Sequence, residues 1–219
     1  MTKEEKHMKI EKFPYGPLES NVFLVRFSED AFVIDAGASL GFLSPLPEKV
    51  RAVFCTHGHF DHIQAVDDLK KVYECPVYVH EADMPMFLLT ENTFSEPTAP
   101  KKTIPVSLKD GQVFSGKELS FLVEDEKFLL EVVHTPGHTS GSVCFFLRDF
   151  SKEKEVSYLF SGDTVFEGTV GRTDLGGSMK EMMASIHKIK QFPDDTILFP
   201  GHGNETTIYR EKAKNPYFT

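Results

Sequence analysis

The chain has 219 residues, which allows one large domain or two small ones, with about 70 % of the unfolded surface buried on folding. Apolar residues make up 40 % and charged residues 26 %, a balance that excludes disordered and collagen-like proteins. The formal net charge of -9, without a clustered run of Lys and Arg, argues against a nucleic-acid partner.

The N-terminal stretch MTKEEKHMKI carries charges where a secretory signal needs about 7–15 apolar residues, and no apolar run reaches about 18 residues. We therefore expect a cytoplasmic protein with no membrane partner. Cys55, Cys75 and Cys144 form no CxxC pair, and each lies in or beside a β-rich run. We expect them to be buried thiols rather than disulfide partners or metal ligands.

The first half of the chain predicts strands that lead into a helix. Two β-rich runs, NVFLVRF and AFVIDAG, are separated by turn-like residues 28–30 and predict a hairpin or meander. The run RAVFCTH predicts a buried strand that ends in a histidine cluster. Apolar residues spaced three apart then predict one helix that ends before Pro76. These residues are Ile63, Val66, Leu69 and Val72.

A strand (PVYVH), a short helix (EADMPMFLL) and a Pro- and Thr-rich loop follow. The loop, over residues 91–102, is either a lid or a plain connection. Beyond it, the β pattern returns in a series of runs. These runs are IPVSL, ELSFLV, FLLEVVHT, GSVCFFL and VSYLFSGD.

The last predicted helix, SMKEMMASIHKIKQF, begins with a capping box of Ser178 and Glu181. Its apolar face is expected to pack in the core. This face consists of Met179, Met182, Met183, Ile186 and Ile189. A final strand, TILFP, precedes GHG and a short polar tail. Because no linker or tandem repeat divides the chain, we expect one domain over residues 1–219.

The string THGHFDH, residues 56–62, holds three imidazoles and one carboxylate at the end of an apolar strand. Three further strings, VVHTPGHTSGS, YLFSGDTVF and TILFPGHG, each place a ligand-type side chain in a tight turn after a β-rich run. Imidazole and carboxylate suit borderline divalent metals, and seven donors exceed what one tetrahedral ion can use. We predict two ions about 3.5–4 Å apart that share a carboxylate. The predicted ligands are His57, His59, Asp61, His62, His138, Asp163 and His202.

Zinc is the first expectation for both ions, with iron or manganese as alternatives. The other histidines, His7, His80, His134 and His187, are expected to be structural, but His134 is kept as an alternative contact of the site. Asp35, in VIDAG at a strand end, is expected either to accept a hydrogen bond from a ligand imidazole or to form a turn.

The ordered motifs HxHxDH, PGHTxGS, SGDTVF and PGHG resemble those of the metallo-β-lactamase superfamily over nearly the whole chain. The resemblance implies an α/β fold, an αββα sandwich of two mixed β-sheets flanked by helices. It also implies two metal positions with Asp163 bridging them. The first would hold His57, His59 and His138, and the second Asp61, His62 and His202.

The stretch GDTVFEGTVGRTDLGGS resembles glyoxalase II and its short relatives, which include persulfide dioxygenases. Arg172 falls where glyoxalase II has a basic residue that holds the glutathione carboxylate, whereas Asp174 stands in place of an aromatic residue. Only 17 residues follow His202, where glyoxalase II has a helical domain, so a smaller or different thioester is also considered. A true β-lactamase is disfavoured because His62 and Asp163 differ from the best-known class.

We hypothesise a metal-dependent hydrolase that cleaves a small-molecule thioester, such as an acyl-glutathione, with a metal-bridging hydroxide. Asp61, which would orient the hydroxide proton, and Asp163 are the predicted catalytic residues, and Arg172 is the predicted substrate-binding residue. One alternative is a persulfide dioxygenase with a single iron on His57, His138 and Asp163. Lower alternatives are a lactonase and a non-catalytic metal-binding protein. The sequence leaves the oligomeric state open.

Overall fold

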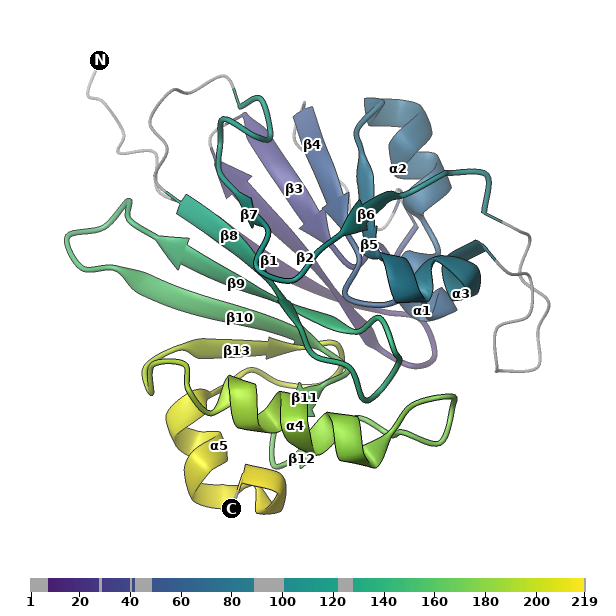
Figure 1. Cartoon of the computed structure of the whole chain (residues 1–219). Coiled ribbons are helices and arrows are strands. Elements are labelled where there is room, and N and C mark those ends of the chain that lie inside the picture. The colour runs from purple at the N-terminus through teal and green to yellow at the C-terminus, as the bar shows by residue number, and fades with distance from the viewer. Residues whose placement is uncertain are drawn as a thin grey trace.

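Two six-stranded sheets lie face to face, and helices cover both outer faces (Figure 1). The structure is a computed structural model that describes residues 8–27, 29–39, 41, 49–88, 101–121 and 128–218. Both sheets mix parallel and antiparallel pairs. The αββα sandwich implied by the sequence motifs is thereby confirmed.

The first sheet has the order β1-β2-β3-β4-β5-β6, antiparallel from β1 to β3 and parallel from β3 to β6. Its strands are β1 (Lys9–Tyr15), β2 (Ser20–Phe27), β3 (Asp30–Ile34), β4 (Lys49–Phe54), β5 (Val77–His80) and β6 (Val106–Leu108). The helices between them are α1 (Phe60–Ile63), α2 (Val66–Tyr73), the 3-10 helix η1 (Glu81–Asp83) and α3 (Met84–Leu88).

The second sheet has the order β14-β13-β10-β9-β8-β7, with β10 and β13 parallel. Its strands are β7 (Val113–Phe114), β8 (Phe128–His134), β9 (Val143–Asp149), β10 (Val156–Gly162), β13 (Ile197–Pro200) and β14 (Thr206–Thr207). A small hairpin, β11 (Val165–Phe166) and β12 (Thr169–Val170), follows β10. The remaining helices are α4 (Met179–Ile189), α5 (Ile208–Lys214) and the 3-10 helix η2 (Pro216–Phe218).

Alternate residues of β2 pack into two different cores because successive side chains of a strand point to opposite faces. Phe23 belongs to the aromatic core between the sheets, where its ring lies 5.1 Å from that of Phe160. Leu24 belongs to the core beneath the helices, together with Val66 and Leu69 of α2. Burial on both faces makes this strand a rigid support for the loops at its ends.

The helix predicted after the histidine cluster is divided in two, which corrects the sequence interpretation. The Ala65 N–H donates to the carbonyl of Ala36 over 2.7 Å, which ties the chain to the segment after β3 and interrupts the helix between α1 and α2. Helix α2 does end before Pro76, as predicted. Val72, expected on the apolar face, is 58 % exposed.

Other local expectations were also wrong. The first residues of the predicted strand ELSFLV lie in turns over 116–120, where Ser120 has a φ of 54°, and its last two residues, 122 and 123, lie outside the described residues. Met179 and Met183 of α4 are exposed, whereas the rest of the predicted face is buried. The expected polar tail instead forms β14 and α5, and Ile208 of α5 is buried.

Some expectations fall outside the described residues, namely those for His7, Ser28 and most of the predicted lid loop over residues 91–102. The prediction of a single domain stays a prediction. All three cysteines are free and buried, as expected. None of the helices in the described ranges combines the length and apolar character needed to span a bilayer.

Candidate metal centre

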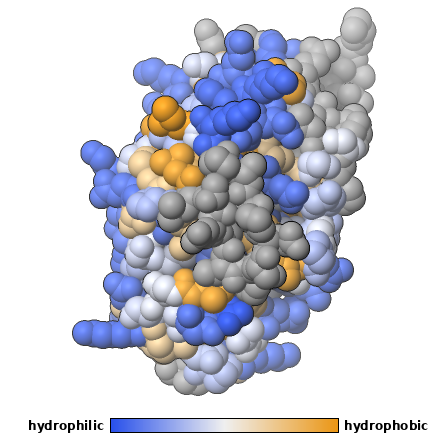
Figure 2. Space-filling view, turned by 90° about the vertical axis from the view of Figure 1, so that its right-hand side faces the viewer, coloured by the Kyte–Doolittle hydropathy of each residue, from blue (hydrophilic) through white to orange (hydrophobic). Residues whose placement is uncertain are grey.

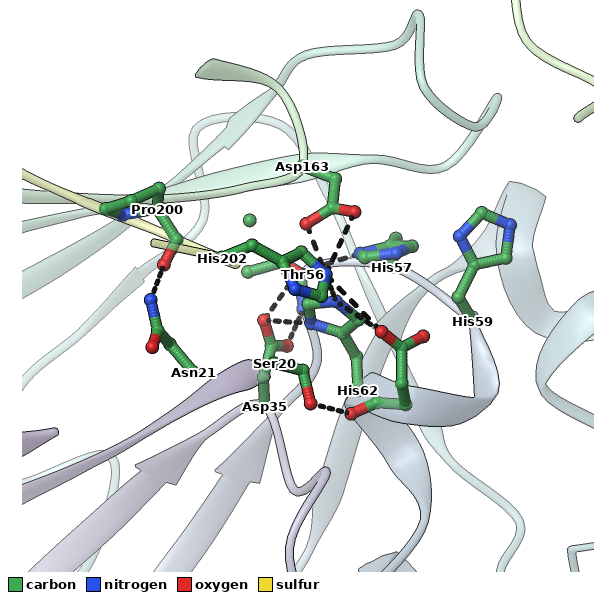
Figure 3. A network of polar contacts seen from close by, with 12 residues as sticks. Ser20, Asn21, Asp35, Thr56, His57, His59, His62, Asp163, Pro200 and His202 are labelled. Carbon is green, nitrogen blue, oxygen red and sulfur yellow. Dashed lines mark hydrogen bonds and ion pairs between the residues drawn. The ribbon is translucent and has the colours of Figure 1, made fainter. Parts of the chain in front are cut away.

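The seven predicted ligands come from four segments that follow strand ends, and the structure brings all of them together. Figure 3 shows five of them, His57, His59, His62, Asp163 and His202. One segment, residues 57–62, follows β4 and enters α1. The other three carry His138 between β8 and β9, Asp163 after β10 and His202 after β13. Since β10 and β13 are parallel, their carboxyl ends meet at one edge of the second sheet.

The first donor group consists of His57, His59 and His138, whose ligand atoms lie within 4.8 Å of one another. The Nδ1 of His59 and the Nε2 of His138 are 2.8 Å apart. All three imidazoles are buried. Three imidazoles that converge in this way offer a site for one borderline divalent ion.

The second donor group consists of Asp61, His62 and His202. The Nε2 atoms of His62 and His202 are 3.4 Å apart. The Oδ2 atom of Asp61 lies 3.6 Å from the first of these nitrogens and 3.4 Å from the second. This group could hold a second ion with two nitrogens and one oxygen.

Asp163 lies between the two groups. Its Oδ1 is 3.5 Å from the Nε2 of His62, and its Oδ2 is 3.5 Å from the Nε2 of His138. The same Oδ2 is 3.6 Å from the Nε2 of His202. One carboxylate therefore faces both donor groups, the arrangement that a bridging ligand requires.

Unpaired buried atoms test whether metal ions fit these residues. Among the atoms that the structure describes, the Nε2 of His57 and the Oδ1 of Asp163 are buried without a hydrogen-bond partner. Leaving such atoms unpaired is costly in a protein interior. His57 belongs to the first donor group and Asp163 lies between the two groups, so divalent cations bound there would satisfy both atoms.

Hydrogen bonds at the outer ring nitrogens orient the imidazoles. The Nδ1–H of His138 donates to the carbonyl of Arg172 over 2.7 Å, and that of His202 donates to the carbonyl of Leu18 over 2.8 Å. These bonds leave each Nε2 free as an electron-pair donor toward the cluster, as a metal-binding histidine needs.

Asp35 has the role that was one of its two sequence interpretations. Its Oδ2 accepts the Nδ1–H of His62 over 2.9 Å and the hydroxyl of Thr56 over 2.8 Å. The Thr56 oxygen lies 3.0 Å from the Nδ1 of His57, so it can accept that N–H in turn. A single buried carboxylate thus orients one imidazole of each donor group.

Burial keeps two histidines of the first donor group, His57 and His59, neutral. It lowers the pKa of His57 well below its usual range. Burial, together with the neighbouring His138, lowers the pKa of His59 to about 4. Neutral imidazole is the form that binds metal, so these two histidines are ready to bind at neutral pH.

Nearby carboxylates set the protonation of the second donor group. Burial opposes protonation of His62, but the surrounding carboxylates raise its pKa to about 10. These carboxylates are Asp163, Asp35 and Asp61. Burial also acts to raise the pKa of Asp61, yet His62 and His202 lower it to about 2. Such a concentration of negative charge favours a cation, and an ion bound here would take the place of the proton on His62.

A glycine makes room for the cluster. A Cβ on Gly201 would collide with the Oδ1 of Asp163 and the ring of His62. The GHG string therefore requires glycine directly before His202, because the backbone of this segment passes against two of the predicted ligands.

Arg172 lies at the rim of the site with its side chain 52 % exposed. Its backbone carbonyl holds His138, while its guanidinium forms two hydrogen bonds of 2.6 Å with the carboxylate of Asp174. His134 and His80 stack on each other with ring centroids 4.1 Å apart. Neither belongs to a donor group, and the exposed His187 lies on α4.

Sequence reasoning missed the residues that tie β2 to the ligand segments. The Ser20 hydroxyl donates to the carbonyl of Asp61 over 2.8 Å. The Asn21 amide donates to the carbonyl of Pro200 over 2.9 Å (Figure 3) and to that of Gly203 over 3.0 Å, on either side of His202. The sequence feature that could have indicated these contacts is the polar Ser-Asn pair at the start of an otherwise largely apolar strand.

A family model described as the metallo-beta-lactamase superfamily matches residues 15–202, and the chain belongs to this superfamily. It is 31 % identical to hydroxyacylglutathione hydrolase GloC of Haemophilus influenzae, over 96 % of this chain and 98 % of that protein.

Two solved structures are similar over nearly their whole length. BLEG-1, a B3 metallo-beta-lactamase, has a TM-score of 0.79 at 32 % identity, with 96 % of this chain and all of the other covered. TTHA1623 in a di-iron-bound form has a TM-score of 0.74 at 30 % identity, with 94 % and 99 % covered. Fold, family and relatives together define a metallo-hydrolase with a candidate metal centre rich in His and Asp.

Proposed function

We propose that this chain is a hydrolase with two divalent metal ions that cleaves a thioester, with an acyl-glutathione as the first substrate class to test. The observation that carries the proposal is the placement of Asp163 between two donor groups, with an oxygen 3.5 Å from an imidazole nitrogen of each. Zinc is the expected metal, and iron stands beside it because a similar protein has been solved in a di-iron-bound form.

His57, His59 and His138 would hold the first ion, Asp61, His62 and His202 the second, and Asp163 both. Two such ions, when bound, would supply a water nucleophile activated at neutral pH. The low pKa of Asp61, about 2, keeps its carboxylate ionised, so it could orient that water by accepting a hydrogen bond. No Ser or Cys nucleophile is then required.

A thioester suits this site because its leaving group needs little help. A thiol has a pKa of about 8.5, so a thiolate can depart without a proton donor. The amine that leaves an amide bond needs such a donor. The similarity to a hydroxyacylglutathione hydrolase supports the same substrate class.

Arg172 is proposed to bind a carboxylate of the substrate. Its backbone is fixed beside His138, and its exposed guanidinium already binds one carboxylate, that of Asp174, through two donors. An incoming carboxylate would share or displace this partner. Because the existing pair is exposed to solvent, exchange should cost little.

The proposal is tested by a panel of substrates with protein of known metal content. The arms are S-acetylglutathione, glutathione persulfide with oxygen consumption as readout, a simple lactone and a β-lactam. We expect the glutathione thioester to be hydrolysed fastest. Oxygen consumption with a single bound iron would instead establish the dioxygenase, and preferred cleavage of the β-lactam would place the chain with BLEG-1. Metal binding without turnover in any arm would favour a non-catalytic protein.

A further inference from the structure

Asp83, at the end of η1, has a buried carboxylate that contacts two of the segments that carry predicted metal ligands. The residue is 1 % exposed. Its Oδ2 accepts the N–H of Gly58 over 2.9 Å and the hydroxyl of Thr139 over 2.7 Å. Its Oδ1 accepts the N–H of Gly141 over 2.7 Å. Both oxygens are therefore held by well-formed hydrogen bonds.

These contacts lie next to the first donor group. Gly58 separates His57 from His59, and Thr139 directly follows His138. One carboxylate thus connects the backbone between two of the three imidazoles to the loop that carries the third. We propose that Asp83 is a positioning residue of the metal centre, which sets the spacing of these imidazoles and so the affinity of the first metal position.

The packing around Asp83 supports a close, fixed connection. A Cβ on Gly141 would lie 2.5 Å from the Oδ1 of Asp83, so that loop can approach only as glycine. A Cβ on Gly58 would lie 3.2 Å from the backbone of Asp83 and from Met86 of α3. Gly58 of the HGH string and Gly141 of the TSGS string therefore allow both loops to approach Asp83 closely.

Charge supports the same role. The three donors to Asp83, two backbone N–H groups and one hydroxyl, are all neutral. Its negative charge is therefore stabilised but not cancelled by them, and it attracts a cation bound by the adjacent imidazoles. Thr139 is held in turn, because its hydroxyl lies 2.8 Å from that of Ser142.

The inference rests on the proposed metal centre, so the test begins with the unmodified protein. Metal-free protein is titrated with Co²⁺ in competition with a chromophoric chelator, which gives the affinity of each position, and the visible Co²⁺ bands report the ligand geometry. The variants are Asp83→Asn and Thr139→Val. Asparagine keeps the shape, but its single oxygen cannot accept from both the Gly58 and the Gly141 N–H.

Glu211 offers a matched control. It is 2 % exposed and accepts hydrogen bonds from the N–H of Gly168, the hydroxyl of Thr206 and the amide of Asn215. Glu211→Gln therefore removes a carboxylate that is similarly buried and hydrogen-bonded but contacts no segment with a predicted ligand. Affinities are compared at a temperature where every variant is folded by circular dichroism.

We expect Asp83→Asn to weaken one of the two Co²⁺ positions about 10- to 100-fold and to change its bands, with a smaller effect from Thr139→Val. Glu211→Gln should lower the melting temperature and leave both affinities unchanged. If Asp83→Asn lowers stability only, as the control does, or weakens both positions equally, the positioning role is wrong. If the unmodified protein binds no Co²⁺, the proposed metal centre itself fails. Should Asp83→Asn not fold, unchanged Co²⁺ affinity in Thr139→Val would overturn the inference.

Discussion

The Nδ1–H of His62 donates to the carboxylate of Asp35 over 2.9 Å, with both side chains almost fully buried. Asp35 holds this position with a φ of 57°, a left-handed conformation that is uncommon for a residue other than glycine. The backbone N–H of Thr56 binds the other oxygen of the same carboxylate over 2.7 Å. A strained residue at the end of β3 thus sets the direction in which His62 presents its Nε2.

Asp35→Asn should weaken metal binding about 10- to 100-fold, because the amide cannot accept from all the donors that now surround the carboxylate. The measurement is competition for Zn²⁺ with a chromophoric chelator. Asp30→Asn serves as the control, since Asp30 is equally buried on β3 but binds Arg51 rather than a predicted ligand. An unchanged Zn²⁺ affinity in Asp35→Asn would show that the contact only supports the fold.

Asp163→Asn keeps the shape of the side chain and removes the charge that faces both donor groups. Hydrolysis of the preferred thioester should fall about a hundredfold or more, the scale of losing one electrostatic contact with a transition state. Turnover is measured at known metal content, with the exposed Asp195→Asn as control. Unchanged turnover with a full complement of metal would show that Asp163 does not bridge.

Arg172→Ala should reduce kcat/KM for a glutathione thioester by about ten- to a hundredfold, because a charge-assisted contact with the substrate carboxylate is lost. An uncharged thioester should be almost unaffected. Lys154→Ala, which removes a different exposed cation from its ion pair, is the control. Equal losses on both substrates would mean that Arg172 supports the site only through its backbone bond to His138.

Asp174→Asn gives a second test of the same contact, with the opposite sign. It frees the guanidinium of Arg172 from its carboxylate partner, so KM for the charged thioester should decrease. The uncharged thioester again serves as reference. An increased KM for the charged substrate alone would show that Asp174 is needed to orient Arg172 for binding.

His80 should make the protein less stable in acid. Burial and the stacked ring of His134 lower its pKa, and its Nδ1 accepts the N–H of Ala82, which requires the neutral ring. In the unfolded chain the pKa of His80 is about 6.5, so the unfolded state binds the proton more readily than the folded state. The contribution of neutral His80 to folding stability is therefore present above about pH 6.5 and is lost as the pH falls below that value. The nearby carboxylates oppose the shift without reversing it. They are Glu81, Asp83 and Asp110.

His80→Asn keeps an acceptor for the Ala82 N–H and cannot titrate. Its melting temperature should therefore fall less than that of the unmodified protein between pH 7.5 and pH 5.5, measured in excess metal. His187→Asn, at an exposed histidine of α4, should leave the pH dependence unchanged. An identical pH dependence in His80→Asn and the unmodified protein would show that titration of His80 does not lower the stability in acid.

The seven candidate ligands could be predicted from the sequence because each lies in a short local pattern, a β-rich run that ends in a turn with Gly and His or Asp. The order of those patterns also carries the resemblance to the metallo-β-lactamase superfamily, which implies the fold. Their partners could not be found this way, because the contacts of Asp83 and Asn21 join residues far apart in the chain. The sequence around Asp83, EADMPMFLL, predicts a short helix and gives no sign of a contact with the ligand segments.

Secondary structure was missed where tertiary contacts decide it. The break between α1 and α2 depends on a hydrogen bond from Ala65 to Ala36, which no helical periodicity can show. Strand β1 contains Pro14 and lies at the edge of its sheet, where among the described strands it pairs with β2. The C-terminal helix α5 is short and depends on the burial of Ile208 for its place in the fold.

The central claim is that two metal ions, held by both halves of the chain, are needed for hydrolysis. The direct measurement strips the protein with a chelator, adds Zn²⁺, Fe²⁺ or Mn²⁺ stepwise, and records bound ions per chain, thioester hydrolysis and melting temperature in the same samples. The account predicts that activity rises until about two ions are bound per chain. It also predicts that the melting temperature rises with loading, because the ions bind only the folded state. Full activity with one tight ion, and no second position at saturation, would contradict it.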